Sequence, residues 1–192
     1  MPDPNPAALD FLLTRRSRPA KTLTAPAPDR PALQTLLIAA ARSPDHGKLE
    51  PWRFVVLQRA ALDRLAAAAV ARGTALGLDP DKIEKARTQF ANSQLAVAVI
   101  SAPKPSDKIP RIEQVYSAGA VCLALLNAAL AAGWGANWLS GWASHDRDFV
   151  ETALALTADE SVAGFVHIGT ETSAPPDRPR PDVAAITHWM DA

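Results

Sequence analysis

Three neighbouring residues near the start of the chain have the chemistry to bind a phosphate group. Arg15, Arg16 and Ser17 follow a short apolar segment, and guanidinium groups bind phosphate through charge-assisted, partly bidentate hydrogen bonds. The Ser17 hydroxyl and the backbone N–H groups would add further donors. Arginines at the C-terminal end of a helix also complement the helix macrodipole. Taken alone, this segment therefore leaves both interpretations open.

A polar loop in residues 42–52 is the second segment that could carry a site. It contains Arg42 and His46, and Pro44 and Pro51 bound its central part. Loops held between rigid elements often carry functional side chains, although a lone histidine also fits a structural or surface role. The other histidines are scattered along the chain, so we expect no zinc site. The absence of a Gly-x-Ser-x-Gly motif argues against a serine hydrolase.

The third segment, residues 133–142, combines glycines with tryptophans. Glycine lets a backbone come close to a flat ligand, and indole rings offer apolar walls. The same pattern fits a glycine-interrupted strand followed by a turn, so two interpretations stay open here as well. The chain has neither a Gly-x-Gly-x-x-Gly motif between a strand and a helix nor a Walker loop. Neither a Rossmann site nor a P-loop is therefore indicated.

The hydrophobic pattern predicts the helices and strands that must position these segments. Helices are expected over residues 7–15, 31–42, 59–72, 79–92, 111–132 and 146–156. Strands are expected over residues 52–57, 95–101, 133–140 and 162–170. Surface positions are expected for residues 19–30 and for the loop 102–110, and the proline-rich tail from Glu171 is expected to be extended. Because no repeat or linker divides the chain, we expect a single α+β domain over residues 1–192.

The composition limits the partners that the chain can have. Its 192 residues contain 20 Lys and Arg against 20 Asp and Glu, so no basic surplus exists to attract nucleic acid or an anionic membrane surface. Cys122 is the single cysteine, which excludes an intramolecular disulfide. The N-terminal segment lacks the basic and apolar regions of a signal peptide, and we expect no apolar run of membrane-spanning length. These features predict a soluble cytoplasmic protein that binds neither nucleic acid nor a membrane.

In their order along the chain, these segments resemble the signatures of the nitroreductase family, and most closely those of its compact bacterial members. Residues 15–17, after an N-terminal helix, are similar to the family's phosphate-binding opening. The sequence Ala-Arg-Ser-Pro-Asp-His at 41–46, followed by Pro-Trp at 51–52, is similar to its second signature. Residues 133–141 and 162–170 resemble the last two. The resemblance implies an α+β, nitroreductase-like fold, with a central mixed β-sheet flanked by helices, in a homodimer.

The resemblance also implies an FMN-dependent NAD(P)H oxidoreductase with two FMN sites, each built from both chains. Three groups of residues would contact FMN: Arg15, Arg16 and Ser17 at the phosphate and ribityl end, Arg42 and His46 from the other subunit, and Trp138, Leu139 and Ser140 along the isoalloxazine ring. A backbone N–H near Ser140 or Gly141 would face N5 of the ring. The redox chemistry belongs to the cofactor, so no side-chain nucleophile is needed; the sequence identifies no catalytic side chain, leaves the proton donor unknown and indicates no metal site.

Two positions depart from the family pattern. Glu50 stands where many relatives have glutamine before Pro-Trp, which weakens the case for a direct flavin contact there. Larger relatives use a basic pair near the C-terminus for the phosphate. Arg178 and Arg180 could serve in that role, but proline-flanked arginines in a tail are as readily exposed to solvent, so neither is included in the predicted site.

The resemblance implies a ping-pong reaction, in which NAD(P)H and a small electrophilic acceptor, such as a nitroaromatic compound or a quinone, use the same face of FMN in turn. A protein that sequesters or delivers FMN without significant turnover would use the same arginines and glycines. A helical interaction protein without a cofactor is a third reading. The sequence specifies neither the physiological substrate nor a preference between NADH and NADPH.

Overall fold

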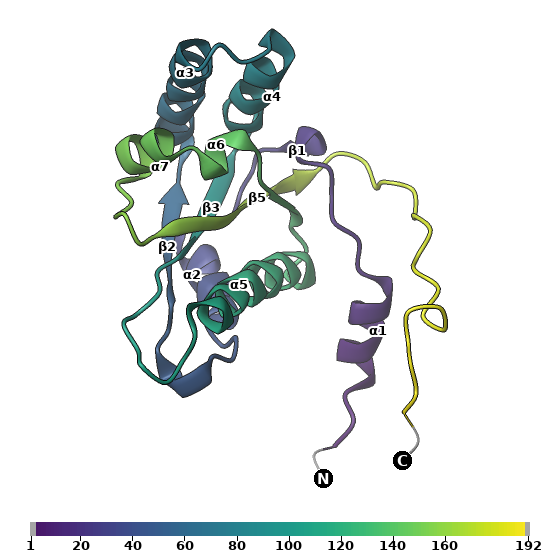
Figure 1. Ribbon diagram of the computed structural model, residues 1–192. Coiled ribbons are helices and arrows are strands. Elements are labelled where there is room, and N and C mark those ends of the chain that lie inside the picture. The colour runs from purple at the N-terminus through teal and green to yellow at the C-terminus, as the bar shows by residue number, and fades with distance from the viewer. Residues whose placement is uncertain (1–2, 191–192) are drawn as a thin grey trace.

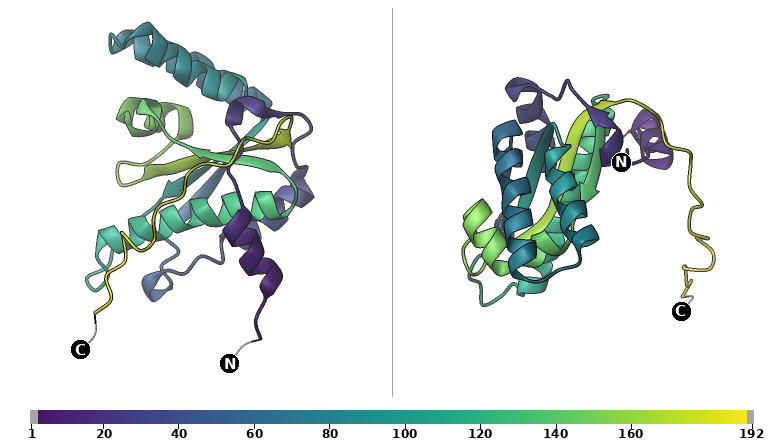
Figure 2. Two further views of the ribbon diagram at one scale, coloured as in Figure 1. Left: turned by 90° about the vertical axis from the view of Figure 1, so that its right-hand side faces the viewer. Right: turned by 90° about the horizontal axis from the view of Figure 1, so that it is seen from above.

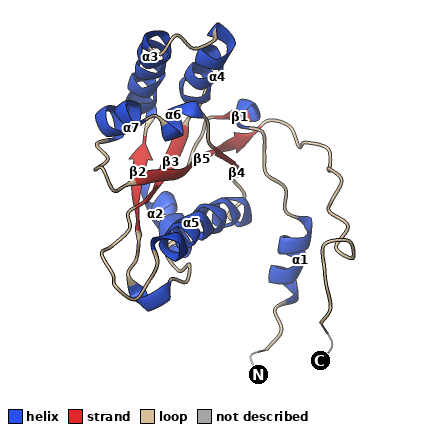
Figure 3. Ribbon diagram, in the orientation of Figure 1, coloured by secondary structure: helices blue, strands red, loops and turns tan. Residues whose placement is uncertain are grey.

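The structure, a computed structural model, describes residues 3–190 and consists of helices packed on both faces of a β-sheet (Figures 1 and 3). The helices are α1 (Pro6–Thr14), α2 (Arg30–Ala40), α3 (Arg59–Ala75), α4 (Pro80–Ala91), α5 (Arg111–Ala131), α6 (Trp142–His145) and α7 (Arg147–Leu154). The strands are β1 (Leu23–Thr24), β2 (Trp52–Leu57), β3 (Leu95–Ser101), β4 (Gly135–Leu139) and β5 (Ser161–Glu171). Short 3₁₀ helices, η1 (Ala20–Thr22) and η2 (His46–Lys48), lie in two of the connecting loops. The expected α+β class is confirmed.

The sheet has β3 and β5 at its centre. Its strand order is β1-β5-β3-β2, and β4 also pairs with β5. Every strand pair within residues 3–190 is antiparallel, so the expectation of a mixed sheet is wrong for this part of the chain. For β2 and β3 the reason is the helical hairpin α3–α4, which returns the chain to the end of the sheet that it left. A parallel pair would instead need a crossover to the opposite end.

Strand β3 separates two hydrophobic cores because its side chains alternate between the two faces of the sheet. Ala96 and Ala98 pack in the core formed with α3, α4, α6 and α7. Val97 and Val99 pack in the core formed with α2 and α5. All residues of β3 are buried, which explains why its apolar run is nearly continuous and confirms its expected central place.

Helix α5 is long and apolar enough to cross a membrane when length and composition alone are considered. The expectation that no run reaches this length was therefore wrong. The helix packs against β3, β4 and β5, where Val121, Cys122 and Leu125 are fully buried. A place in the core thus explains the apolar residues of one face of α5, while Ile112, Tyr116 and Leu123 on the rest of the helix are exposed. Burial raises the pKa of the Cys122 thiol to about 12, so this side chain acts as a small buried hydrophobic group.

Helix α1 and the C-terminal tail project from the body of the molecule (Figures 1 and 2). Asn5 caps α1 through its side chain, and a proline occupies the first turn, so this helix is specified by local signals. It has no buried residue, and Leu9, Leu12 and Leu13 are exposed. Trp189 in the tail is 84% exposed. Both segments therefore present apolar side chains that no other part of residues 3–190 covers.

The shortest elements were not predicted: η1, η2, β1 and α6. Strand β1 lies within residues 19–30, where the buried Leu23 pairs with Glu171 of β5. Helix α6 is a single turn that follows β4. Elements of two to four residues give no periodic pattern, because a period needs several repeats before it can be recognised.

Candidate functional site

The segment that follows α1 holds two arginines whose buried nitrogens lack partners. Arg15 Nη2 donates to the Ser17 hydroxyl at 2.9 Å, and Arg16 Nη1 donates to the Ser17 carbonyl at 3.5 Å. The Nε atoms of both arginines are buried and make no hydrogen bond within residues 3–190. A buried unpaired donor costs about 1–3 kcal/mol. These two N–H groups are therefore suited to an acceptor that comes from outside the described chain.

The charge around these arginines is strongly positive. Burial, together with the nearby guanidinium groups of Arg180 and Arg16, lowers the pKa of Arg15 below its usual value. Arg180 belongs to the C-terminal tail, where it donates to Asp177 at 3.0 Å. The tail thus adds a third guanidinium together with its carboxylate partner Asp177, which also interacts with Arg16, so the net positive charge of the cluster comes from Arg15 and Arg16; Arg180 is not among the predicted site residues. A cluster of this kind favours an anion such as phosphate.

Two hydrogen bonds hold residues 15–18, here called the cationic segment, against the edge of β4. The Arg18 N–H donates to the Ala136 carbonyl at 2.8 Å, and the Asn137 side-chain amide donates to the Arg18 carbonyl at 2.7 Å. The Arg18 guanidinium pairs with Glu171 at 2.6 Å, so it is already neutralised. Backbone groups alternate in direction along a strand. The N–H and C=O of Trp138 therefore point to the same edge as the Ala136 carbonyl.

The side chains of Trp138 and Leu139 lie on opposite faces of the sheet. Trp138 pairs with Val166, and Leu139 pairs with Phe165. Paired residues share a face, and these two partners belong to different cores. Trp138 covers Gly164, where an added Cβ would overlap the indole nitrogen. Because strand geometry separates neighbouring side chains, only one of these two residues could meet a ring along this segment with its side chain, and the contact of Trp138, Leu139 and Ser140 with the flavin stays a prediction.

A hollow of about 380 Å³, here called the β4 hollow, lies between η1, α4 and the end of β4. Leu139 and Ser140 form its β4 side. The other lining residues come from η1 and from α4 with the turn after it: Ala20, Lys21, Lys85, Thr88, Gln89, Asn92 and Ser93. None of these was predicted, because α4 carries no motif and reaches β4 only through the fold. The cationic segment is joined to β4 through Arg18. It continues directly into Ala20 and Lys21, which line this hollow.

One of the two backbone donors expected after β4 is already engaged. The Gly141 N–H donates to Ser144 Oγ at 3.2 Å, within the turn that begins α6. Ser140 precedes this turn and lines the β4 hollow. Of the two expected donors, the Ser140 N–H is therefore the better candidate to meet a ligand.

The loop with Arg42 and His46 lies at the end of the sheet away from α3 and α4, below β2 in Figure 1. His46 Nδ1 is 2.7 Å from Glu113 Oε2 at the start of α5, and Arg42 is exposed. Within one chain, the predicted residues thus form two separate groups. The first comprises residues 15–17 and 138–140, and the second comprises Arg42 and His46.

This loop contains an unusual concentration of strained backbone. Gly47, Lys48 and Glu50 have φ angles of 76°, 56° and 48°, a region that residues with a Cβ rarely adopt. Asp45 fixes the loop by accepting the Glu50 N–H at 2.9 Å. A Cβ at Gly47 would overlap Ile109. Strain of this kind clusters at ligand-binding sites, which favours a functional role for the loop.

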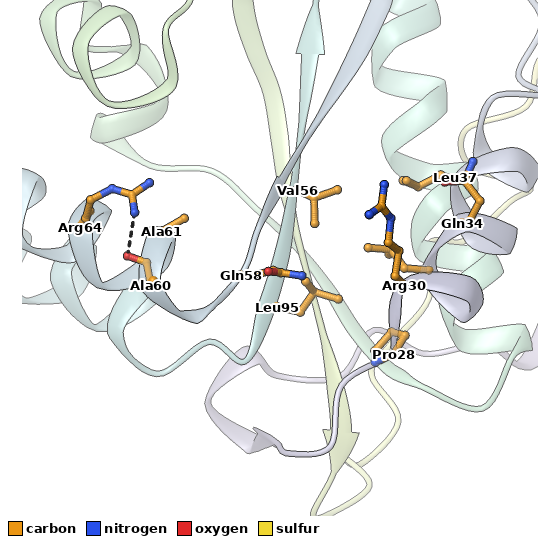
Figure 4. A pocket seen from close by; sticks show the side chains of 11 residues that line it. Pro28, Arg30, Gln34, Leu37, Val56, Gln58, Ala60, Ala61, Arg64 and Leu95 are labelled. Carbon is orange, nitrogen blue, oxygen red and sulfur yellow. Dashed lines mark hydrogen bonds between the residues drawn. The ribbon is translucent and has the colours of Figure 1, made fainter.

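A separate hollow of about 510 Å³ lies at the outer edge of β2 (Figure 4). Figure 4 shows Arg64 and Arg30 on opposite sides of Val56 and Leu95. None of the predicted site residues lines this hollow. Size alone therefore does not identify the functional site, and the β4 hollow has the stronger case because the cationic segment leads into it.

Residues 12–170 match the nitroreductase family. The chain belongs to this family, as its four sequence segments and its helix-flanked antiparallel sheet had suggested. Membership places it in a family of oxidoreductases.

Among its relatives is YdjA of Escherichia coli K12, provisionally named an NAD(P)H nitroreductase. It is 36% identical over 163 residues, which cover 85% of this chain and 87% of YdjA. A Haemophilus influenzae protein with the same provisional function is 34% identical over 165 residues, covering 85% and 88% of the two chains.

Solved structures share the fold. A nitroreductase-like protein from Bacillus cereus superposes with a TM-score of 0.81 at 22% identity over 100% of both chains. A nitroreductase from Desulfovibrio desulfuricans, whose assignment is also provisional and which was solved in complex with FMN, superposes with a TM-score of 0.73 at 21% identity. The match covers 99% of this chain and 100% of that one. The expected nitroreductase-like fold is confirmed.

Proposed function

We propose that the chain is an FMN-dependent oxidoreductase that transfers electrons from NAD(P)H to a small electrophilic acceptor, such as a nitroaromatic compound or a quinone. The observation that carries this proposal is the pair of buried, unpartnered Nε atoms of Arg15 and Arg16 in the segment that leads into the β4 hollow. FMN has a phosphate at one end and a flat ring at the other, and the cationic segment and the hollow correspond to these two parts. The NAD(P)H nitroreductase names of the relatives and the FMN complex of one structural neighbour support the proposal.

The residues present fit FMN as a ligand. Arg15, Arg16 and Ser17 would hold the phosphate, with Arg180 as an additional cation. Ser140 would offer its N–H to the ring at the end of β4. When bound, FMN supplies the hydride and electron chemistry. The chain's own part is to bind and orient the reactants and to limit the access of water.

The proposed reactions balance without a further reactant. A quinone, NAD(P)H and a proton give a hydroquinone and NAD(P)⁺. A nitro compound, NAD(P)H and a proton give a nitroso compound, NAD(P)⁺ and water. We expect donor and acceptor to occupy one site in turn, which is the ping-pong pattern and gives parallel lines in double-reciprocal plots.

We also propose a homodimer in which Arg42 and His46 of one subunit reach the FMN held by residues 15–17 of the other. The separation of the two groups within one chain supports this arrangement. So do the exposed apolar side chains that a second copy could cover: Leu9, Leu12, Leu13, Ile112, Tyr116, Leu123, Val183, Ile186, Trp189 and Met190. Obligate dimers of this kind bury more than about 2,000 Å².

Turnover separates this proposal from its alternatives. Without oxygen, the purified protein should oxidise NADH or NADPH beyond one equivalent per FMN only when a quinone or nitroaromatic acceptor is present. Bound FMN without acceptor-dependent oxidation would instead favour a protein that sequesters or delivers flavin. A preparation that stays colourless after FMN supplementation would favour an interaction protein without a cofactor.

Mixed dimers test whether the site is shared. Arg16→Ala and His46→Ala should each lower activity. After subunit exchange, each heterodimer would have one site with both defects and one site with neither, so activity should return on mixing. Verified exchange without any return of activity would place Arg16 and His46 in the same subunit's half of the site.

A further inference from the structure

A second hollow, of about 310 Å³, adjoins the β4 hollow on the side of α6. The two hollows share Lys85, Gln89 and Ser140. Lys82 and Trp142 line only the second hollow, which is here called the Trp142 hollow. Because three lining residues are common to both, a ligand in the Trp142 hollow would lie next to a ligand in the β4 hollow.

The indole of Trp142 is a rigid wall of this hollow. Its Nε1–H donates to the Lys82 carbonyl at 3.3 Å, which ties the ring to α4. The ring packs edge-on against Phe149 of α7, with a centroid distance of 6.2 Å. On the side of α3, a Cβ at Gly73 would come within 3.3 Å of the ring. Three helices thus fix an aromatic surface in advance, and such a surface suits a planar ligand.

Free positive charge stands at the rim of the same hollow. Lys82 and Lys85 are exposed, and neither forms an ion pair within residues 3–190. The neighbouring arginines differ, since Arg87 pairs with Glu84 on α4 and Arg72 pairs with residues near the start of α7. Of these four residues, only Lys82 and Lys85 have no carboxylate partner within residues 3–190, and both line the Trp142 hollow.

We propose that the Trp142 hollow is the acceptor site and that it selects planar aromatic acceptors that carry a carboxylate or a similar anionic group. Trp142 would pack against the aromatic ring, and Lys82 would pair with the anion. The proposal rests on the FMN position proposed for the β4 hollow, because only an acceptor next to the flavin can be reduced. Uncharged acceptors would bind through the ring alone and therefore less tightly.

Acceptor kinetics test the selectivity. For the FMN-loaded protein, kcat/KM should be higher for 4-nitrobenzoate than for uncharged 4-nitrobenzyl alcohol, and added salt should reduce the difference. Lys82→Gln should lower kcat/KM for 4-nitrobenzoate by roughly fivefold, the effect of one partly solvated ion pair. The loss should appear in KM, with the alcohol unaffected. Arg64→Gln, at the β2 edge, removes one charge elsewhere and should change neither value.

The phosphates of NADPH could pair with the same ammonium groups. The kinetics are therefore measured with both NADH and NADPH as the electron donor. If Lys82→Gln lowered kcat/KM for NADPH but not for NADH, and left 4-nitrobenzoate unchanged, Lys82 would serve the donor and the proposal would be overturned.

Equilibrium binding separates failure of this proposal from failure of the proposed function. Benzoate, which cannot be reduced, should bind to the purified protein in a calorimetric titration, and Lys82→Gln should weaken it by roughly fivefold. Uncharged benzamide should show no difference between the two proteins. Benzoate binding that Lys82→Gln leaves unchanged would overturn the anion site even in an active enzyme. A protein that binds benzoate through Lys82 but lacks flavin turnover would refute the proposed function and, with it, the assignment as an acceptor site.

Discussion

Replacing Arg16 with alanine should weaken FMN binding specifically at the phosphate. The Arg16 Nε is buried without a partner, so a phosphate oxygen that accepts this N–H would satisfy it. A hydrogen bond to a charged group contributes about 1.5–3 kcal/mol. The expected loss of FMN affinity is therefore roughly tenfold to a hundredfold.

Riboflavin provides the matched control ligand, because it has the same ring and ribityl chain but no phosphate. Apoprotein is titrated with each ligand, and quenching of flavin fluorescence gives the two dissociation constants. Arg16→Ala should raise the Kd for FMN and leave the Kd for riboflavin unchanged, while Arg30→Ala, at the β2 edge, should change neither. An equal loss for both ligands, or no loss for FMN, would refute the assignment of Arg16 to the phosphate.

Other predictions concern stability and reactivity. Gly164→Ala should lower the melting temperature, because its new methyl group would overlap the Trp138 indole and overpacking costs about 1–3 kcal/mol. Hydrogen bonding to Arg53 lowers the pKa of Glu160 to about 2, so its carboxylate stabilises the fold above its ordinary pKa of 4.5 and loses this effect as the pH falls toward 2,. The melting-temperature difference between wild type and Glu160→Gln should therefore be largest near neutral pH and shrink in acid. Cys122, buried and with a pKa of about 12, should react with a thiol reagent only after unfolding.

Long periodic elements could be predicted from the sequence, and short ones could not. The strands at 52–57 and 95–101 have the expected bounds, because alternating or continuous apolar runs of this length are distinctive. The sequence has no pattern that gives the relative direction of the strands. A mixed sheet was therefore expected, whereas the described pairs are antiparallel. Helix α5 shows a second limit, since its buried and exposed apolar faces cannot be told apart in sequence.

The candidate site was predictable only where it has a local motif. Residues 15–17 form one contiguous stretch and residues 42–46 form another, so the chemistry of each could be recognised before the fold was known. Lys82 and Lys85 resemble any exposed lysines of a helix, and only the fold, which places α4 across the hollows from Ser140, brings them there. The opposite orientation of the Trp138 and Leu139 side chains follows from strand alternation, so it could be predicted once this segment was recognised as a strand.

The visible spectrum of the purified protein tests the central claim most directly. The preparation should be yellow after FMN supplementation and gel filtration, and heat denaturation should release FMN. Without oxygen, NADH or NADPH should bleach the flavin band, and a quinone added afterwards should restore it. A protein that retains no flavin, or whose flavin band neither NADH nor NADPH changes, would contradict the account.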